Sequence, residues 1–291
     1  MRYEGAIFRP PSEADSLILQ VTIGCSHNRC KFCGSYKEKK FRVRTIEEIK
    51  EDLTEAKRYA RFVKKVFLAD GDALVVPQKM LLPIFEEIKS TFPKLERIGI
   101  YGNVKSILKK SVDDLRKLKE LGLGIVYLGI ESGDQVTLNR MDKGTTVEKI
   151  EEASKRVKDA GITLSVTVLL GIGGEERTRI HAEETGKLLS RIEPDYVGAL
   201  TLIVIPGTPL ADEMRMGKFR LPDTFKLLEE LYVMIENINV KKTFFASNHA
   251  SNYLPLKGWL PDEKERMLSA IRYVLEVKDP SILRPEYLRA L

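Results

Sequence analysis

All three cysteines of the chain, Cys25, Cys30 and Cys33, lie within one short segment. Thiolates at this spacing can bind one metal centre together. A closed structural zinc site needs four protein ligands, and His27 is the histidine in this segment that would complete the set. A cubane iron-sulfur cluster suits three thiolates better, because each cysteine holds one iron and the fourth iron stays open. The segment therefore favours an iron-sulfur cluster over a zinc site or three unrelated buried thiols.

A regular series of elements surrounds this segment. The apolar run 17–23 immediately before the cysteines predicts a buried strand, and alternating strand and helix patterns follow it. Such serial units require parallel strands with right-handed crossovers, which gives a partial barrel or an open doubly wound sheet. The predicted strands span 17–23, 65–69, 95–101, 125–130, 162–170 and 196–205, and the helices span 45–61, 77–90, 111–121, 146–160, 175–190 and 222–238.

The pattern predicts three parts of the chain. Residues 1–16 carry Pro10-Pro11 and no periodicity, so we expect an irregular lead-in. Residues 17–240 form the α/β core. Residues 241–291 are expected to be a carboxyl-terminal extension that packs on this core, with a strand near 243–247, a loop at 248–259 and a helix at 261–277.

Composition restricts the class of protein. The net charge is +6 and 31% of the residues are charged, which fits either a surface rich in lysine and glutamate or attraction to a polyanion such as tRNA. The basic residues are interspersed with acidic ones, so nucleic acid is possible but not favoured. Three cysteines make no disulfide framework, and neither a signal peptide nor a membrane span is recognisable. We expect a soluble, cytoplasmic protein.

The cysteine segment resembles the cluster loop of radical S-adenosylmethionine (SAM) enzymes. In that superfamily three cysteines bind a 4Fe-4S cluster, an aromatic residue precedes the last cysteine, and the loop follows the first strand of a partial barrel. Phe32 matches the aromatic residue. The usual motif has three residues between the first two cysteines, whereas this chain has the four residues 26–29. The resemblance implies a partial (βα)6 barrel of TIM type.

The same resemblance assigns SAM-binding roles to the loops after two later strands. Asp70, Gly71 and Asp72 resemble the segment that accepts hydrogen bonds from the methionine ammonium. Glu131 and Ser132 resemble the Gly-x-Glu-Ser segment of the methylthiotransferase, Elongator-like and oxygen-independent coproporphyrinogen oxidase branches, where they lie beside the ribose and methionine. A carboxylate suits two ribose hydroxyls because it can accept from both.

Further segments extend this resemblance to about residue 215. Arg140 and Lys143 are the candidates for pairing with the methionine carboxylate, and the sequence does not decide between them. Gly171 lies in a glycine-containing loop that resembles the segment after the fifth strand, where backbone can approach a ligand. Pro206 begins a Pro-Gly-Thr-Pro segment that resembles one near the adenine.

The resemblance implies an enzyme that cleaves SAM reductively to a 5'-deoxyadenosyl radical and abstracts hydrogen from a substrate. A small molecule is the expected substrate, and ferredoxin or flavodoxin the expected electron donor. His249 and Tyr253, in a polar run of the extension, are the candidate catalytic residues. The alternatives are a tRNA-modifying enzyme of the same class, a non-catalytic iron-sulfur or zinc protein, and a protein that binds an ordinary nucleotide.

Overall fold

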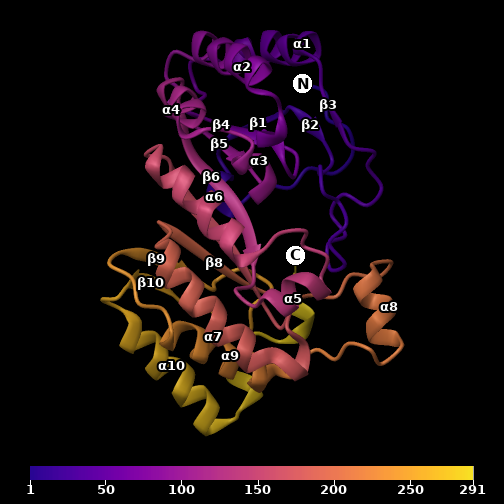
Figure 1. Ribbon diagram of the computed structural model, residues 1–291, viewed down its shortest axis with the longest axis vertical. Helices are drawn as coiled ribbons and strands as arrows, with labels where there is room; N and C mark the ends of the chain where they lie inside the picture. The colour runs from indigo at the N-terminus through magenta and orange to yellow at the C-terminus, as the bar shows by residue number, and fades with distance from the viewer. Residues whose placement is uncertain (291) are drawn as a thin grey trace. The chain divides into compact units, whose positions relative to one another are not determined.

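The computed structural model (Figure 1) describes residues 1–290. These residues fall into two compact units. The first unit comprises Met1–Asn28, Ser35–Leu128 and Glu152–Leu164, and the second comprises Arg29–Gly34, Gly129–Glu151 and the chain from Ser165 onward.

A sheet of eight strands contains nearly all of the strand residues. Its order is β1-β4-β5-β6-β7-β8-β9-β10. The pairs β1·β4, β4·β5, β5·β6, β7·β8 and β8·β9 are parallel, and β9·β10 is antiparallel. The parallel α/β class predicted from the alternating pattern is therefore confirmed. The strands are β1 (Leu17–Gln20), β4 (Lys65–Ala69), β5 (Arg97–Tyr101), β6 (Leu123–Glu131), β7 (Thr163–Leu170), β8 (Tyr196–Thr201), β9 (Thr243–Ala246) and β10 (Lys257–Leu260).

Helices follow the parallel strands as the periodicity predicted. Thr45 and Ser111 each close a capping box at the start of a helix, so two predicted helix starts are confirmed. Three short helices, α3, α5 and α8, were not predicted. The helices are α1 (Ile46–Ala56), α2 (Gln78–Thr91), α3 (Val104–Leu108), α4 (Val112–Glu120), α5 (Gln135–Arg140), α6 (Val147–Asp159), α7 (Gly174–Ile192), α8 (Pro209–Arg215), α9 (Thr224–Glu236) and α10 (Lys264–Val277). No helix within residues 1–290 is long and apolar enough to cross a membrane.

In the first unit, α1 and α2 lie side by side and α2 also contacts α4 (Figure 1). Successive strand residues point to opposite faces of the sheet, so both faces of β4 are buried. On one face, Phe67 and Tyr127 pack with Ile7 of the lead-in. The lead-in also places the buried Glu13 carboxylate against the Tyr127 hydroxyl. Ile7 and Glu13 thus attach the lead-in to the core of this unit, although most residues of 1–16 are exposed.

A small hairpin forms the base of the cysteine segment. β2 (Thr22–Ile23) pairs antiparallel with β3 (Arg42–Val43). The prediction of one strand over 17–23 is therefore corrected, because β1 ends at Gln20 and the chain enters this second, two-stranded sheet.

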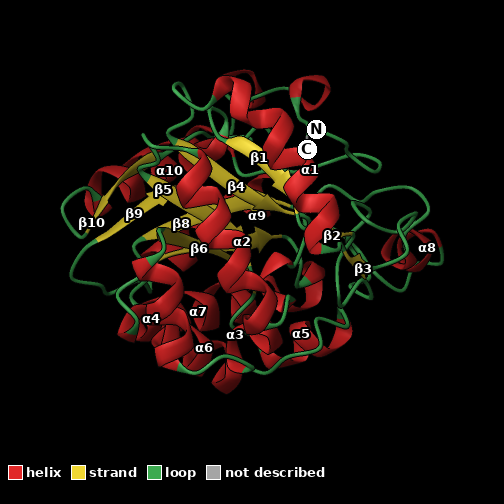
Figure 2. Ribbon diagram, turned by 90° about the horizontal axis from the view of Figure 1, so that it is seen from above, coloured by secondary structure: helices red, strands yellow, loops and turns green. Residues whose placement is uncertain are grey.

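In the second unit, α9 packs against both α7 and α10. Figure 2 shows β8, β9 and β10 side by side. The prediction of a loop over 248–259 is wrong at its end, where β10 begins at Lys257. In β10, exposed and buried residues alternate, the pattern of a strand with one face packed. The strand predicted over 196–205 ends at Thr201.

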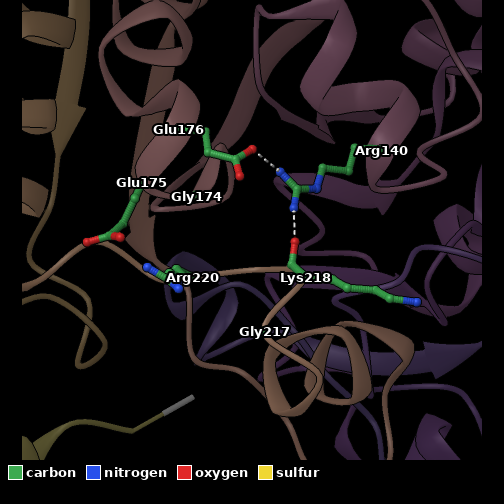
Figure 3. Close-up of a pocket in the computed structure, with 7 residues that line it drawn as sticks. All are labelled: Arg140, Gly174, Glu175, Glu176, Gly217, Lys218 and Arg220. Carbon is green, nitrogen blue, oxygen red and sulfur yellow. Dashed lines mark hydrogen bonds and ion pairs between the residues drawn. The ribbon is translucent and has the colours of Figure 1, made fainter.

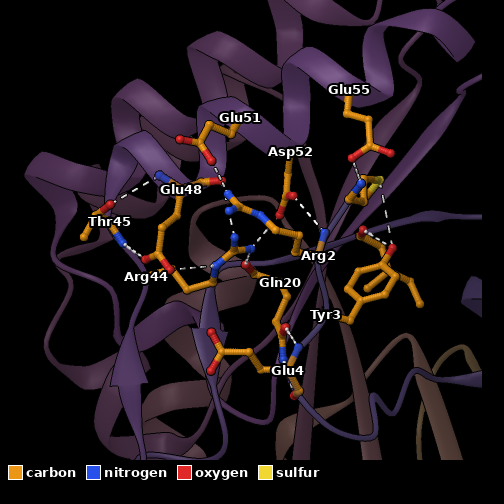
Figure 4. A network of polar contacts seen from close by, with 12 residues as sticks. Arg2, Tyr3, Glu4, Gln20, Arg44, Thr45, Glu48, Glu51, Asp52 and Glu55 are labelled. Carbon is orange, nitrogen blue, oxygen red and sulfur yellow. Dashed lines mark hydrogen bonds and ion pairs between the residues drawn. The ribbon is translucent and has the colours of Figure 1, made fainter.

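An ion-pair network anchors α1 in the first unit (Figure 4). Arg44 and Asp52 are both almost fully buried, and Arg44 Nη1 donates to Asp52 Oδ2 at 2.6 Å. Arg44 Nη1 also donates to the carbonyl of Gln20 at 2.8 Å, and the backbone N–H of Arg2 donates to Asp52 Oδ1 at 2.9 Å. One buried pair therefore connects the amino terminus, the end of β1 and α1.

We expect Asp52→Ala to destabilise the first unit by roughly 3–5 kcal/mol, because it leaves the buried Arg44 guanidinium without its carboxylate. Glu51→Ala removes an exposed pair with Arg2 and should cost only about 0–1 kcal/mol. Urea unfolding of both variants checks this difference. Equal free energies of unfolding for the two variants would contradict it.

Candidate functional site

The three cysteines are half-buried, and none forms a disulfide. Cys25 belongs to the first unit, and Cys30 and Cys33 belong to the second. No group of three or more His, Cys, Asp or Glu side chains that could hold a metal ion occurs within residues 1–290. The donor set itself consists of reduced thiols, which is the chemistry that an iron-sulfur cluster requires.

In the first unit, Asp70 holds the base of the cysteine segment. This wholly buried carboxylate follows β4, and its Oδ2 accepts hydrogen bonds from Gly24 N at 2.8 Å, Gln20 Nε2 at 2.9 Å and Lys39 Nζ at 2.9 Å. Its Oδ1 is buried and has no hydrogen-bond partner within residues 1–290. A buried carboxylate oxygen with an unused lone pair fits an added cationic donor, such as the ammonium predicted for this position.

Gly71 and Asp72 contact the same segment in different ways. A Cβ at Gly71 would lie 2.5 Å from the ring of Tyr36, so this position is compatible only with glycine while the ring stays in place. The Asp72 carboxylate is wholly buried and accepts hydrogen bonds from Ser26 and from residues of α3 and its cap. Burial raises the pKa of Asp72, although the hydrogen bonds from Ser106 and Ser26 oppose this shift.

In the second unit, the later half of the cysteine segment is tied down by backbone hydrogen bonds. Lys31 N donates to Met141 O at 3.0 Å, and Leu210 N donates to Lys31 O at 3.1 Å. Lys31 Nζ pairs with Glu213 at 2.5 Å. Phe32 packs against an apolar cluster that contains Met141 and Leu210. Phe32 therefore serves as a packing anchor between Cys30 and Cys33.

Glu131 and Lys143 form a close pair in the second unit. Lys143 Nζ donates to Glu131 Oε1 at 2.8 Å, and both side chains are largely buried. Glu131, the last residue of β6, adopts a left-handed backbone with φ of 64°. A Cβ at Gly129 would lie 2.3 Å from Glu131 Oε1, so the glycine leaves room for this carboxylate. The structure thus brings together two of the residues predicted to bind SAM.

Ser132 is buried in a chain of polar contacts. Its Oγ lies 2.7 Å from His181 Nδ1 and accepts a hydrogen bond from Asp134 N at 2.9 Å. His181 Nε2 lies 3.4 Å from Glu230 Oε1 without a hydrogen bond to it, and Glu230 Oε1 accepts a hydrogen bond from Gly171 N at 2.6 Å. All these side chains are buried. The chain of contacts therefore links the loop after β6 to the loop after β7.

Arg140 lines a pocket of about 210 Å³ at the start of α7 (Figure 3). Its Nη1 donates to Glu176 at 3.3 Å, and its Nη2 donates to the carbonyl of Lys218. The guanidinium also lies over the ring of Phe219. Glu175, Lys218 and Arg220 line the same pocket, so charges of both signs surround Arg140.

Gly171 and Pro206 lie in two different loops of the second unit. Gly171 has φ of 83°, and a Cβ there would lie within 3.0 Å of Leu227 and Leu221. Pro206 is exposed in the turn before α8, where Thr208 caps the helix. The missing side chain of Gly171 thus leaves room for two leucines, and the approach of a ligand to Gly171 and the place of Pro206 near the adenine stay predictions.

His249 and Tyr253 are held by the end of the chain. His249 Nδ1 accepts a hydrogen bond from Ser251 N at 3.1 Å, and burial together with the charge of Arg284 lowers the pKa of His249. The Tyr253 hydroxyl donates to Glu286 at 2.6 Å. Burial and the bond to Glu286 raise the pKa of Tyr253. The lowered pKa favours the neutral imidazole of His249.

A comparison with known protein families identifies the superfamily of this chain. A family model described as the radical SAM superfamily matches residues 19–187, which is more than half of the chain. The chain belongs to the radical SAM superfamily. The predicted fold class, enzyme class and reductive cleavage of SAM are confirmed at the level of this family.

Individual relatives are distant. An uncharacterised protein of Methanocaldococcus jannaschii is 25% identical over 83% of this chain and 78% of its own length. A ribosomal protein uS12 methylthiotransferase of Caldanaerobacter subterraneus is 25% identical over 65% of this chain, which spans only 44% of that relative. The solved structure of coproporphyrinogen III oxidase from Escherichia coli, itself described as a radical SAM enzyme, shares the fold with a TM-score of 0.58 at 16% identity and covers 76% of this chain and 51% of its own.

Several residues that hold the candidate site were not identified from the sequence. They lie far along the chain from the residues they contact, so local patterns do not reveal them. A weak signal exists, since Asn103 follows β5 as Asp70 follows β4. The residues are Gln20, Lys39, Asn103, Ser106, His181 and Glu230.

We expect an acid-dependent loss of stability that depends on Asp134, the residue that caps α5 beside Ser132. Burial alone would raise the pKa of Asp134, but hydrogen bonds from Arg177 and Thr137 outweigh it and lower the pKa to about 2. Because the unfolded pKa is about 3.9, the carboxylate stabilises the fold above pH 4. This stabilisation is lost as the pH falls toward 2.

Thermal unfolding of Asp134→Asn between pH 2 and pH 7 checks this expectation. The variant should be less stable than the wild type at pH 7, and the difference should shrink below pH 4. A difference in melting temperature that stays constant down to pH 2 would contradict the role of Asp134.

Proposed function

We propose that Cys25, Cys30 and Cys33 bind a 4Fe-4S cluster and that the enzyme uses it to abstract hydrogen from a small-molecule substrate. When bound, the cluster supplies the electron that breaks the sulfonium S–C5' bond of SAM and gives a 5'-deoxyadenosyl radical. The observation that carries this proposal is the family match over residues 19–187, which includes all three cysteines. The extra residue between Cys25 and Cys30 is accommodated if it changes only the curve of the loop.

The residues of the chain would bind and orient SAM. Asp70 Oδ1, a buried acceptor without a hydrogen-bond partner within residues 1–290, suits the methionine ammonium. Glu131 suits the ribose hydroxyls, and Lys143 beside it suits the methionine carboxylate. Ser132 would act indirectly, because its hydroxyl is buried between His181 and the backbone of Asp134. Phe32 packs beside the cluster ligands, and Gly171 and Pro206 would lie toward the nucleoside.

A small molecule is the substrate class that we favour over nucleic acid. Basic residues on α6 and α7 pair with carboxylates one turn away, as Lys155 does with Asp159 and Arg179 with Glu183. Mixed charge of this kind lacks the continuous basic stripe that a polyanion requires. His249 and Tyr253 are the residues that we assign to the substrate, and a cytoplasmic ferredoxin or flavodoxin would supply electrons.

We expect alanine at any one of the three cysteines to abolish formation of 5'-deoxyadenosine from SAM. The assay uses anaerobically reconstituted protein reduced with dithionite, with iron and sulfide measured on the same samples. His27→Ala is the control, because a zinc site would need this residue as its fourth ligand. The control should keep its iron and its activity. A colourless protein whose zinc depends on His27 would overturn the proposed function.

We expect Lys143→Ala to raise the KM for SAM by about tenfold or more, because a charge-assisted hydrogen bond is worth about 1.5–3 kcal/mol. Arg140→Ala should change this KM little, since Arg140 lies in the pocket with Glu176 and Lys218. Cluster content and melting temperature of both variants show whether either has lost its fold. A larger increase in KM for Arg140→Ala would reverse the assignment.

A further inference from the structure

The two residues on either side of Cys25 are each held by a buried aspartate. Gly24 and Ser26 flank the cysteine in the chain, and both donate hydrogen bonds to carboxylates that follow β4. We propose that Asp72 is a positioning residue for the Cys25 thiolate, acting through Ser26 and fixed in turn by Asn103 and Ser106. This inference rests on the proposed function, since it concerns the first ligand of the proposed cluster.

Asp70 fixes the chain before the cysteine. Its Oδ2 accepts from Gly24 N at 2.8 Å, and its backbone N–H donates to the carbonyl of Thr22 at 3.2 Å. Gln20 and Lys39 donate to the same Oδ2. Gly24 is therefore hydrogen-bonded to the residue that follows β4. This bond fixes the position of the backbone immediately before Cys25.

Asp72 fixes the chain after the cysteine. The Ser26 hydroxyl donates to its Oδ2, which also accepts from Ser106 Oγ at 2.6 Å and Asn103 Nδ2 at 2.7 Å. Its Oδ1 accepts from Asn103 N at 3.1 Å. Asn103 Nδ2 lies 3.1 Å from Ser26 Oγ as well. The hydroxyl of Ser26 thus enters a compact polar cluster, here called the Asp72 cluster, made of Ser26, Asp72, Asn103 and Ser106.

The number of donors separates Asp72 from Asp70. A carboxylate offers about four lone-pair sites. Asp72 receives four hydrogen bonds within the Asp72 cluster, whereas Asp70 keeps one oxygen without a hydrogen-bond partner in the described part of the chain. Three of these bonds are on Oδ2 and one is on Oδ1, so Asp72 has less acceptor capacity left than Asp70 for a further donor such as the SAM ammonium. Its bonds to Ser26 on one side and to Asn103 and Ser106 on the other fit a residue that orients the neighbouring cysteine.

On the side away from the cysteine, hydrogen bonds attach the Asp72 cluster to the start of α3. Asn103 caps α3 through its side-chain oxygen, which accepts from Ser106 N at 2.9 Å. Both Asp72 and Ser106 are buried. Partners of this kind orient metal ligands and typically change metal affinity by about 10–100-fold when removed. The residues on either side of Cys25 therefore have fixed positions before the 4Fe-4S cluster binds.

The test compares cluster retention in three variants. Ser26→Ala removes the hydroxyl that bonds to Asp72, Asp72→Ala removes the carboxylate that accepts this bond, and the double variant removes both. Reconstituted proteins are mixed anaerobically with an iron chelator, and the rate of iron release is followed by absorbance. Asp52→Ala is the control, because it removes another buried carboxylate of the first unit that does not contact the cysteine segment.

We expect each single variant to release iron about tenfold faster than the wild type. The double variant should release iron no faster than Asp72→Ala, because both changes break the same link to Cys25. Asp52→Ala should lower the melting temperature yet release iron at nearly the wild-type rate. The reduced-cluster electron paramagnetic resonance spectrum should change in the Ser26 and Asp72 variants and not in the control.

Three outcomes would overturn the inference, and only the last of them would also overturn the proposed function. If the wild type holds a cluster and cleaves SAM, but Ser26→Ala and Asp72→Ala release iron at the rate of the control, only the positioning role fails. The same holds if the effects of the two changes multiply in the double variant. If the reconstituted wild type holds no iron-sulfur cluster, the proposed function and this inference fail together.

Discussion

Buried carboxylates hold the loops of this protein in place through hydrogen bonds from the loop backbone and side chains. A carboxylate removed from water is costly unless its oxygens are bonded, so each one fixes the backbone that supplies its donors. Asp70 fixes Gly24 in the first unit. In the second unit, Glu230 fixes Gly171, and Asp134 fixes the start of α5. The loops that carry the candidate site therefore have defined positions within each unit before any ligand is bound.

The direction of the strands explains why these carboxylates lie where they do. Parallel strands joined by crossover helices place the loops after successive strands at one edge of the sheet. In the first unit, Asp72 follows β4 and Asn103 follows β5, and the two side chains meet there. In the second unit, Glu131 ends β6 and meets Lys143 across a short helix. The order of elements along the chain thus brings distant polar residues together.

Much of this arrangement could be predicted from the sequence, and the rest depends on tertiary contacts. The capping residues Thr45 and Ser111 located two helices because a cap acts on its own first turn. β10 was missed because four residues carry too little periodicity, and the hairpin of β2 and β3 is shorter still. The role of Asp72 could not be read locally, since Asn103 and Ser106 lie more than thirty residues away along the chain.

The short antiparallel strand β10 has a consequence for the behaviour of the protein at high concentration. In the strand order β10 stands at one end, so one side of its backbone lacks a neighbouring strand within the described residues. An open strand edge can pair with another molecule and start aggregation. β10 has the features that prevent this, because it is only four residues long, carries the exposed Lys257 and is followed directly by Pro261. These features oppose pairing of the β10 edge with a second copy of the chain.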